Sequence, residues 1–335
     1  MKGTFVLDNG VFVKSTGTVV GPFEKEGNLI GYMDLSYDDI YCGEKSWEKA
    51  EMRLYQDAIN LAMEKAHITV DDLDAIFGGD LINQNVISHY VLRYYPVPYL
   101  GMFGACSTAM ETLLTASLLI NSGQMKQAIA VTSSHNKAAE RQYRYPIEYG
   151  NKRPKTASFT VTGAGAICLS QDVSDIRVKS VTIGRVIDAK EKNPYDMGSA
   201  MAPAASDTII RHLNDLGVGI DYYDMIVTGD LSEYGTKVLR DIMRSQGYNI
   251  DAVHDDCGLM IYSPKQKKTV NAGGSGCACC AVVTYGYLFH LLKMGEVNRI
   301  LVVATGALHN PTMIMQKESM PCIAHAVAFE RMNVK

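Results

Sequence analysis

Apolar and polar residues follow one another in the same order at two distant places in the chain. Residues 71–81 and 221–231 both have the pattern Asp-x-x-Asp-x-Ile-x-x-Gly-Asp-Leu. The apolar run in each predicts a short strand that follows a helix and ends at Gly-Asp. A glycine-rich turn, a long helix with almost no charge and a second apolar strand come next in both places.

The second strand also ends alike in the two places. Residues 122–136 read SGQMKQAIAVTSSHN, and residues 294–310 read MGEVNRILVVATGALHN. Two copies of one βα-rich unit predict a pseudo-symmetric α/β protein. We expect an N-terminal half over residues 1–172 and a C-terminal half over residues 173–335.

The long helices of the two copies carry almost no charge. Glu111 is the only charged residue of the first helix, and the second has none before Lys293. Helices that are apolar nearly all round must be covered on every side, so we expect the two to lie against each other between two sheets. Residues 270–292 lack charge altogether. Their uninterrupted apolar part is shorter than the about 20 residues of a membrane span, which favours a buried helix.

Both central helices begin at small or capping residues. Thr108 and Glu111 have the spacing of a capping box, which places the first helix start at Ser107 or Thr108. The glycine-rich stretch 273–276 marks the second start and lets the backbone approach a ligand closely. If both N-termini face one crevice, their N–H groups suit an anion. The alternative is that the glycines only let the two helices pack.

Composition narrows the choice of partners. The chain has 32 Lys and Arg against 36 Asp and Glu, and no basic stripe, which argues against nucleic acid. Basic residues gather only within 140–155, where a solvated loop is favoured over a phosphate site. The N-terminus is too polar for a secretory signal, so the eight cysteines are expected to be free thiols. The CACC run at 277–280 lacks the paired spacing of a zinc site.

Three segments together resemble the thiolase and ketoacyl synthase III superfamily. They are the helix-capping cysteine in GACSTAMETLL, the strand TVTGAGAICL and the turn NAGGSGCACC. In the strand, Thr162 stands where the superfamily usually has Asp. The resemblance covers nearly the whole chain and implies an α/β fold, a thiolase-like five-layered αβαβα sandwich built from two duplicated halves.

A narrower resemblance is to the stage V sporulation protein AD family. It rests on residues 15–29 and 41–59 and on the segments NAGGSGC and ATGALHNP, which agree in order. It implies a non-catalytic protein of the developing spore that binds dipicolinic acid (pyridine-2,6-dicarboxylate) and works with the other proteins of a dipicolinate channel complex. Lacking a signal peptide and a spanning helix, the chain would be held at the spore inner membrane by those partners. Members of the superfamily usually form dimers, so the resemblance implies that a homodimer is possible here.

The superfamily's enzymes need partners for the nucleophilic cysteine, whose place is taken here by Cys106. Their thiolate is made by a helix N-terminus and a histidine, and His and Asn groups stabilise the enolate. Asp230 stands near the place of that His, and Gly273 at the place of the Asn. We therefore expect no condensing activity, although His309 or His254 can still approach from another loop.

The expected ligand site combines the two helix starts with two carboxylates. Backbone N–H groups and hydroxyls would hold the ligand carboxylates, and calcium carried with the ligand would satisfy the acidic side chains. Asp255 and Asp256 are further oxygen donors, although helix capping or exposure to water is the favoured interpretation of both. No cofactor and no resident metal are expected. The predicted ligand-binding residues are Cys106, Ser107, Thr108, Asp230, Gly273, Gly274, Ser275 and Glu318.

Two alternatives remain open at this point. One is an acyltransferase that uses Cys106, as thiolases and ketoacyl synthases do. The other is a scaffold with a vestigial cleft, whose surface docks partner proteins. The amphipathic helix over 46–66 is a candidate docking surface, but its apolar face is expected to cover the protein's own core.

Overall fold

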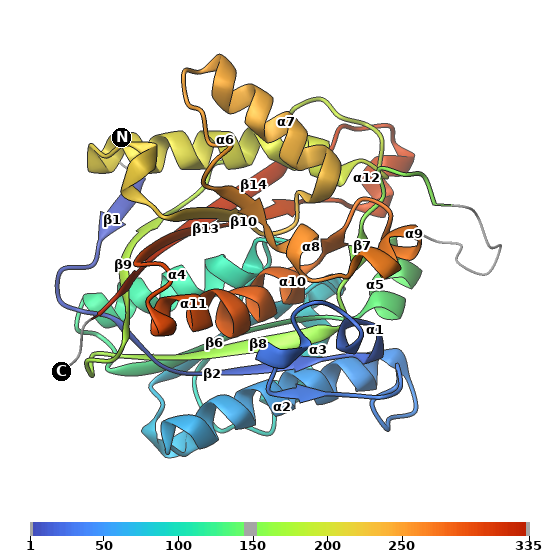
Figure 1. Cartoon of the computed structure of the whole chain (residues 1–335). Coiled ribbons are helices and arrows are strands. Elements are labelled where there is room, and N and C mark those ends of the chain that lie inside the picture. Colours follow the sequence, from blue (N-terminus) through green and yellow to red (C-terminus); the bar gives the residue numbers. More distant parts are fainter. Residues whose placement is uncertain (1–2, 144–152, 333–335) are drawn as a thin grey trace.

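Two apolar helices form the middle layer of the molecule (Figure 1). The computed structural model describes residues 3–143 and 153–332. Helix α4 spans Thr108–Asn121, and helix α10 spans Cys277–Val282. The latter continues through a π-helical turn, Val283–Leu288, into α11, Phe289–Met294. The prediction that two uncharged helices pack between two sheets is confirmed.

Ten strands, joined in one continuous path, make up most of the two sheets. Their bounds are β2 Phe12–Val20, β4 Ala75–Asp80, β5 Tyr99–Gly101, β6 Gln127–Ser134, β8 Gly163–Ser170, β9 Ile176–Thr182, β10 Met225–Thr228, β11 His254–Asp256, β13 Arg299–Ala307 and β14 Cys322–Arg331. One sheet has the order β5-β4-β6-β8-β2, and the other has the order β11-β10-β13-β14-β9. They join where Phe12 on β2 pairs with Arg177 on β9.

The two sheets repeat each other strand for strand. In both, the first three strands are parallel and the last two are added antiparallel. The repeated Gly-Asp-Leu motif therefore falls at the end of β4 in one sheet and just after β10 in the other. The duplication predicted from the sequence is confirmed, while the boundary between residues 172 and 173 stays a prediction.

Longer helices cover the outer faces (Figure 1). Helices α2, Trp47–Ala66, and α3, Val86–Leu92, lie on the N-terminal sheet. Helices α6, Met197–Leu216, and α7, Ser232–Ser245, lie on the C-terminal sheet. Leu54 and Ala58 of α2 are fully buried, so its apolar face covers the core as expected. The result is the five-layered thiolase-like sandwich.

Short elements connect these layers, and α5 and β7 among them contribute residues to the site described below. They are β1 Thr4–Val6, α1 Pro22–Lys25, β3 Leu35–Ser36, α5 Asn136–Tyr143, β7 Phe159–Thr160, α8 Cys257–Met260, α9 Lys267–Val270, β12 Gly274–Ser275 and α12 Pro311–Met315. Residues 144–152 of the basic segment lie outside the described residues. At its ends, Arg141 pairs with Glu48 and Arg153 pairs with Glu140.

The helix from Cys277 to Met294, whose one Lys, Arg, Asp or Glu residue is Lys293, is largely internal. Within the described ranges it is the single helix whose length and composition suffice to cross a membrane, and 72% of it is buried inside the protein. Such burial is what a core helix requires. The interpretation as a buried helix therefore agrees with the structure.

The start of α4 is as predicted, but its capping differs. Ser107 already has helical backbone angles, so it does not present its hydroxyl to the helix N–H groups. Instead, the Thr108 hydroxyl accepts a hydrogen bond from the Gly104 N–H and donates one to the Ala105 carbonyl. The capping box expected between Thr108 and Glu111 is wrong, because the preceding turn already supplies Thr108 with partners.

A buried carboxyl links α1 to the C-terminal half. Glu24 accepts hydrogen bonds from the Thr162 N–H at 3.1 Å and from the Tyr262 hydroxyl at 2.6 Å. It is 3% exposed, and burial raises its pKa to about 7. A carboxyl with a raised folded-state pKa binds its proton more tightly in the folded than in the unfolded state. Stability is then greatest below the unfolded-state pKa and is lost as the pH rises toward 7.

Replacing Glu24 by Gln should remove part of the pH dependence of stability. From the raised pKa of about 7, we expect the carboxyl to lower the free energy of unfolding by on the order of 3 kcal/mol between pH 4.5 and pH 8. Urea unfolding of wild type and Glu24→Gln at both pH values measures this. The exposed Glu26→Gln is the control. Equal pH slopes for wild type and Glu24→Gln would contradict the prediction.

Candidate functional site

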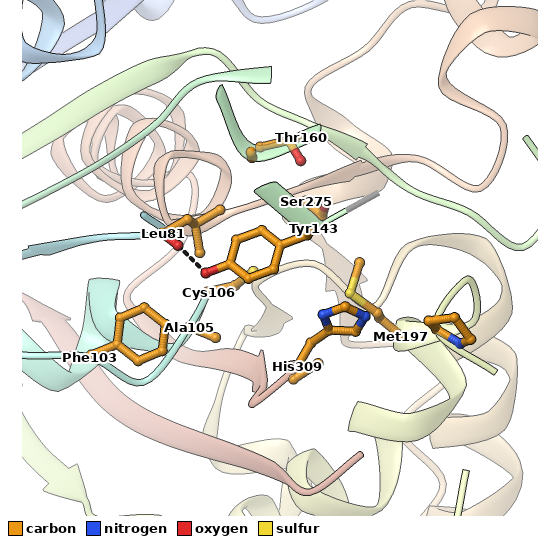
Figure 2. Close-up of a pocket in the computed structure, with 12 residues that line it drawn as sticks. Leu81, Phe103, Ala105, Cys106, Tyr143, Thr160, Met197, Ser275 and His309 are labelled. Carbon is orange, nitrogen blue, oxygen red and sulfur yellow. Dashed lines mark hydrogen bonds between the residues drawn. The ribbon is translucent and has the colours of Figure 1, made fainter. Parts of the chain in front are cut away.

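A small pocket opens where the starts of α4 and α10 approach each other. Its volume is about 50 Å³, compared with the about 10–15 Å³ that one water needs. Figure 2 shows its walls, which are mostly apolar. The lining residues are Leu81, Phe103, Ala105, Cys106, Ala139, Tyr143, Thr160, Pro194, Met197, Ser275, Ala307 and His309.

A tight turn presents Cys106 to this pocket. Ala105, just before it, has a φ of 52°, a left-handed conformation that is uncommon for residues other than glycine. The turn is held by the Ser107 and Thr108 hydroxyls, which donate to the carbonyls of Gly104 and Ala105. Cys106 is thereby partly exposed, whereas the seven other cysteines are buried.

The Cys106 thiol has a carboxylate as its partner. Asp230, which follows β10, is 2% exposed and accepts hydrogen bonds from the Thr305 hydroxyl at 2.6 Å and from the Gly276 N–H at 3.2 Å. The Cys106 thiol is a further donor to it. Burial raises the pKa of Asp230 to about 6. Burial first, and the negative charge of Asp230 second, raise the pKa of the Cys106 thiol well above its usual value.

The start of α10 therefore already holds an anion, which is the side chain of Asp230. The Ala278 N–H in the first turn is in contact with the Ser134 hydroxyl, and the Cys279 N–H donates to the Gly276 carbonyl. We expected the N–H groups at this helix start to be free to bind a ligand carboxylate. This is wrong for the Gly276 N–H, because it already donates a hydrogen bond to the Asp230 carboxylate.

The structure gathers some of the predicted site residues and separates others. Cys106 and Ser275 line the pocket. Asp230 lies directly behind Cys106, and Ser107 and Thr108 are buried in the turn that holds it. The roles of these residues in ligand binding stay predictions.

The remaining predicted residues lie away from this pocket. Gly273 lines a separate cavity of about 330 Å³ together with Tyr262 and Lys267. Gly274 belongs to β12 and pairs with Phe159 of β7. Glu318 is exposed and lines a third cavity, of about 290 Å³. Their binding roles remain predictions.

The acidic stretch after β10 is structural where it is buried. Asp256 accepts hydrogen bonds from the Leu231, Ser232 and Gly258 N–H groups, so helix capping is its role, as favoured from the sequence. His254 is buried against Thr228, and burial lowers its pKa to about 3. Neither lines the pocket. Residues 3–143 and 153–332 contain no cluster of three or more His, Cys, Asp or Glu side chains suited to a metal ion.

Several pocket residues escaped the sequence analysis. Tyr143 and Met197 come from segments with no distinctive motif, Thr160 opens the strand TVTGAGAICL without having been singled out, and only the fold brings the three beside Cys106. His309, by contrast, was named from the sequence as a histidine that can approach Cys106, and it lies just after β13, at the end of the sheet where Asp230 follows β10. The Tyr143 hydroxyl donates to the Leu81 carbonyl, and its ring meets the His309 ring at 80° with 5.7 Å between centroids (Figure 2).

Comparison with known proteins decides the family. The family described as Stage V sporulation protein AD (SpoVAD) matches residues 1–330. Stage V sporulation protein AD of Bacillus subtilis (strain 168) is 54% identical over 330 residues, which cover 98% of this chain and 97% of that protein. The chain belongs to the stage V sporulation protein AD family. Its role accordingly lies in stage V of sporulation.

Solved structures confirm the fold of this SpoVAD family member. The 3-oxoacyl-[acyl-carrier-protein] synthase III from Aquifex aeolicus VF5 is similar with a TM-score of 0.58 and 14% identity, over 96% of this chain and 100% of that one. Cerulenin-bound OleA from Xanthomonas campestris is similar with a TM-score of 0.60 and 16% identity, over 95% and 96%. At such identities the likeness establishes the thiolase-like architecture and no more.

The thiol–carboxylate pair makes a prediction about the reactivity of this SpoVAD family member. Because the thiolate is the reactive form, Cys106 should be alkylated by iodoacetamide at pH 8 at least about tenfold more slowly than free cysteine. Replacing Asp230 by Asn removes the negative charge and should speed the reaction at Cys106. Peptide mass spectrometry of a time course measures both rates.

The control for this experiment is Asp255→Asn, a change in a neighbouring strand that does not touch Cys106. It should leave the alkylation rate unchanged. Rapid alkylation of Cys106 in the wild type, at the rate of an activated thiolate, would contradict the assignment of Asp230 as the partner that keeps the thiol protonated.

Proposed function

We propose that the protein is a non-catalytic binding protein for dipicolinic acid in the developing spore. The observation that carries the proposal is the buried Asp230 carboxyl, held by the Thr305 hydroxyl and the Gly276 N–H, beside the Cys106 thiol. A condensing enzyme needs a reactive thiolate and a hydrogen-bond donor to the enolate. Asp230 instead supplies a hydrogen-bond acceptor, and its negative charge keeps the thiol protonated. Membership of a sporulation family supports the choice of ligand.

The chemistry of the pocket favours binding over acyl transfer. A thiol whose pKa is raised well above its usual value is almost entirely protonated at neutral pH and is a poor nucleophile. An ionised Asp230 only accepts hydrogen bonds, so it cannot stabilise a developing oxyanion. Acyl transfer through Cys106 would require a deprotonated thiol and a hydrogen-bond donor in the place of the Asp230 carboxylate.

The walls suit a flat aromatic ligand with polar ends. Phe103, Tyr143 and Met197 offer apolar and ring surfaces, which pack well against an aromatic ring. The hydroxyls of Thr160 and Ser275 are donors for a carboxylate on the same pocket. As observed, the pocket is smaller than the about 150 Å³ cavity that holds one benzene ring, so a wall must move when the ligand enters.

The proposal extends to calcium and to partner proteins. Calcium would arrive on the ligand, since hard oxygen ligands on the ligand itself are what Ca²⁺ prefers. The protein would reach the spore inner membrane by binding the membrane proteins of a dipicolinate channel complex. A homodimer would form along β5, the edge strand of the N-terminal sheet, where Tyr90, Tyr94 and Leu100 are exposed.

The second candidate function is acyl transfer, which is favoured by one observation. The solved structures that share the fold include a 3-oxoacyl-[acyl-carrier-protein] synthase III, and the cysteine lies at the start of the corresponding central helix. A scaffold with a vestigial cleft is the third alternative. The three differ in which small molecule stabilises the protein.

A thermal-shift titration separates the three functions. A ligand present at about 100 times its Kd stabilises the folded state by about 2.7 kcal/mol, so dipicolinate should raise the Tm by several degrees in a saturable way. Isophthalate, which lacks the ring nitrogen, and acetyl-CoA should not. Each is tested with and without calcium. A shift with acetyl-CoA and none with dipicolinate would overturn the proposal in favour of acyl transfer, and no shift with any compound would favour the scaffold.

A further inference from the structure

His309 stands between two cavities. On one side is the pocket of about 50 Å³ that contains Cys106, and on the other is the cavity of about 290 Å³ that contains Asp188 and Glu318. Among the described residues His309 is the one that lines both, and Figure 2 shows its ring directed toward Tyr143 beside Met197. Turning this one side chain away would join the two spaces.

The charges on the two sides differ. The pocket with Cys106 is lined by described residues that include no Lys or Arg, so the His309 imidazole is the one lining group that can become a cation. Among residues 3–143 and 153–332, the titratable groups that line this pocket with it are Cys106 and Tyr143, with Asp230 behind Cys106. On the other side it faces Asp188 and Glu318.

The far side of His309 carries negative charge. Asp188 accepts hydrogen bonds from the Lys190 ammonium at 2.7 Å and from the Ser319 hydroxyl at 2.8 Å, so it is ionised and partly compensated. Glu318 is exposed on the same cavity. Carboxylates on one side of an imidazole stabilise its positive charge, and that charge then faces the apolar pocket on the other side.

We propose that His309 is the residue that selects an anionic ligand: its imidazole turns from the wall position and, carrying a proton, donates a hydrogen bond to a ligand carboxylate. The inference rests on the proposed function and adds the contact that the pocket otherwise lacks. The aromatic ring of the ligand then occupies the joined space, which exceeds the about 150 Å³ that one benzene ring needs. Binding takes up a proton, so affinity falls as the pH rises through the range in which imidazole titrates.

Calorimetric titration with dipicolinate tests the inference. Performed from pH 5.5 to pH 8 in two buffers of different ionisation enthalpy, it gives the affinity and the number of protons taken up. For the wild type we expect net proton uptake and weaker binding at high pH. Loss of a charge-assisted hydrogen bond should cost about 10- to 100-fold in affinity at pH 6 in His309→Gln.

Three further variants make the result unambiguous. His309→Phe keeps a ring against Tyr143 but has no donor, and it should bind as weakly as His309→Gln. Asp230→Asn removes the other group near the ligand that can take up a proton. In this variant the affinity for dipicolinate should still fall with rising pH, because His309 is still present. His290→Gln, which replaces a histidine stacked on Tyr32 outside the pocket, should bind like the wild type.

The outcomes distinguish the two levels of the proposal. If wild type binds dipicolinate and both His309 variants, folded by their melting curves, keep its affinity and pH dependence, the role of His309 is overturned while the proposed function stands. If wild type binds no dipicolinate at any pH, the proposed function is overturned, and this inference with it.

Discussion

The fold depends on the need to cover two nearly uncharged helices on every side. Helices α4 and α10 have no polar face to offer to water, so a sheet must lie on each side of the pair. Each sheet in turn has an outer face that α2 or α6 covers. Five layers follow from that one requirement, and the same requirement brings the two helix starts together.

The site is a consequence of the duplication. Asp80 and Asp230 end equivalent strands, and Cys106 and Cys277 begin the equivalent central regions. Because the halves face each other, the cysteine of one half lies near the aspartate of the other. Asp230 raises the pKa of the Cys106 thiol, and burial followed by Asp80 raises that of Cys277. Only the Cys106 side opens to a pocket, since Cys277 is fully buried.

The carboxyl groups beneath the pocket set its chemical character. Asp230 and Asp256 are both buried, and burial raises their pKa values to about 6 and about 7. Each is held by several donors, so neither is available to form a new bond without losing an old one. The described residues that line the pocket are uncharged side chains together with the titratable Cys106, Tyr143 and His309, a lining suited to holding a molecule rather than activating one.

Much of the architecture could be predicted from the sequence, and less of the site could. The repeat at 71–81 and 221–231 predicted the duplication, and the missing charges around 270–292 predicted a buried helix, because both are properties of continuous segments. Cys106 and Ser275 were predicted correctly as neighbours since they mark the two helix starts. Tyr143 and Met197 could not be placed, because only the packing of separate segments brings them to Cys106, and His309 was named only as one of two histidines that can approach it.

Glu318 lies away from Cys106 for a similar reason. From the sequence it was grouped with Cys106 as one of the carboxylates available to a ligand. In the structure the His309 ring separates the two, and Glu318 lies on the cavity behind it. Which side chain forms the wall between two cavities depends on rotamers and neighbours, which a linear pattern does not encode.

The claim that this site binds rather than reacts can be examined on the sulfur atom itself. Intact-mass spectrometry of the purified protein after incubation with a series of acyl-CoA thioesters would reveal any acyl group transferred to Cys106. We expect no adduct with any member of the series, because the thiol stays protonated against Asp230. A stoichiometric thioester on Cys106 would contradict this account and make the protein an acyltransferase.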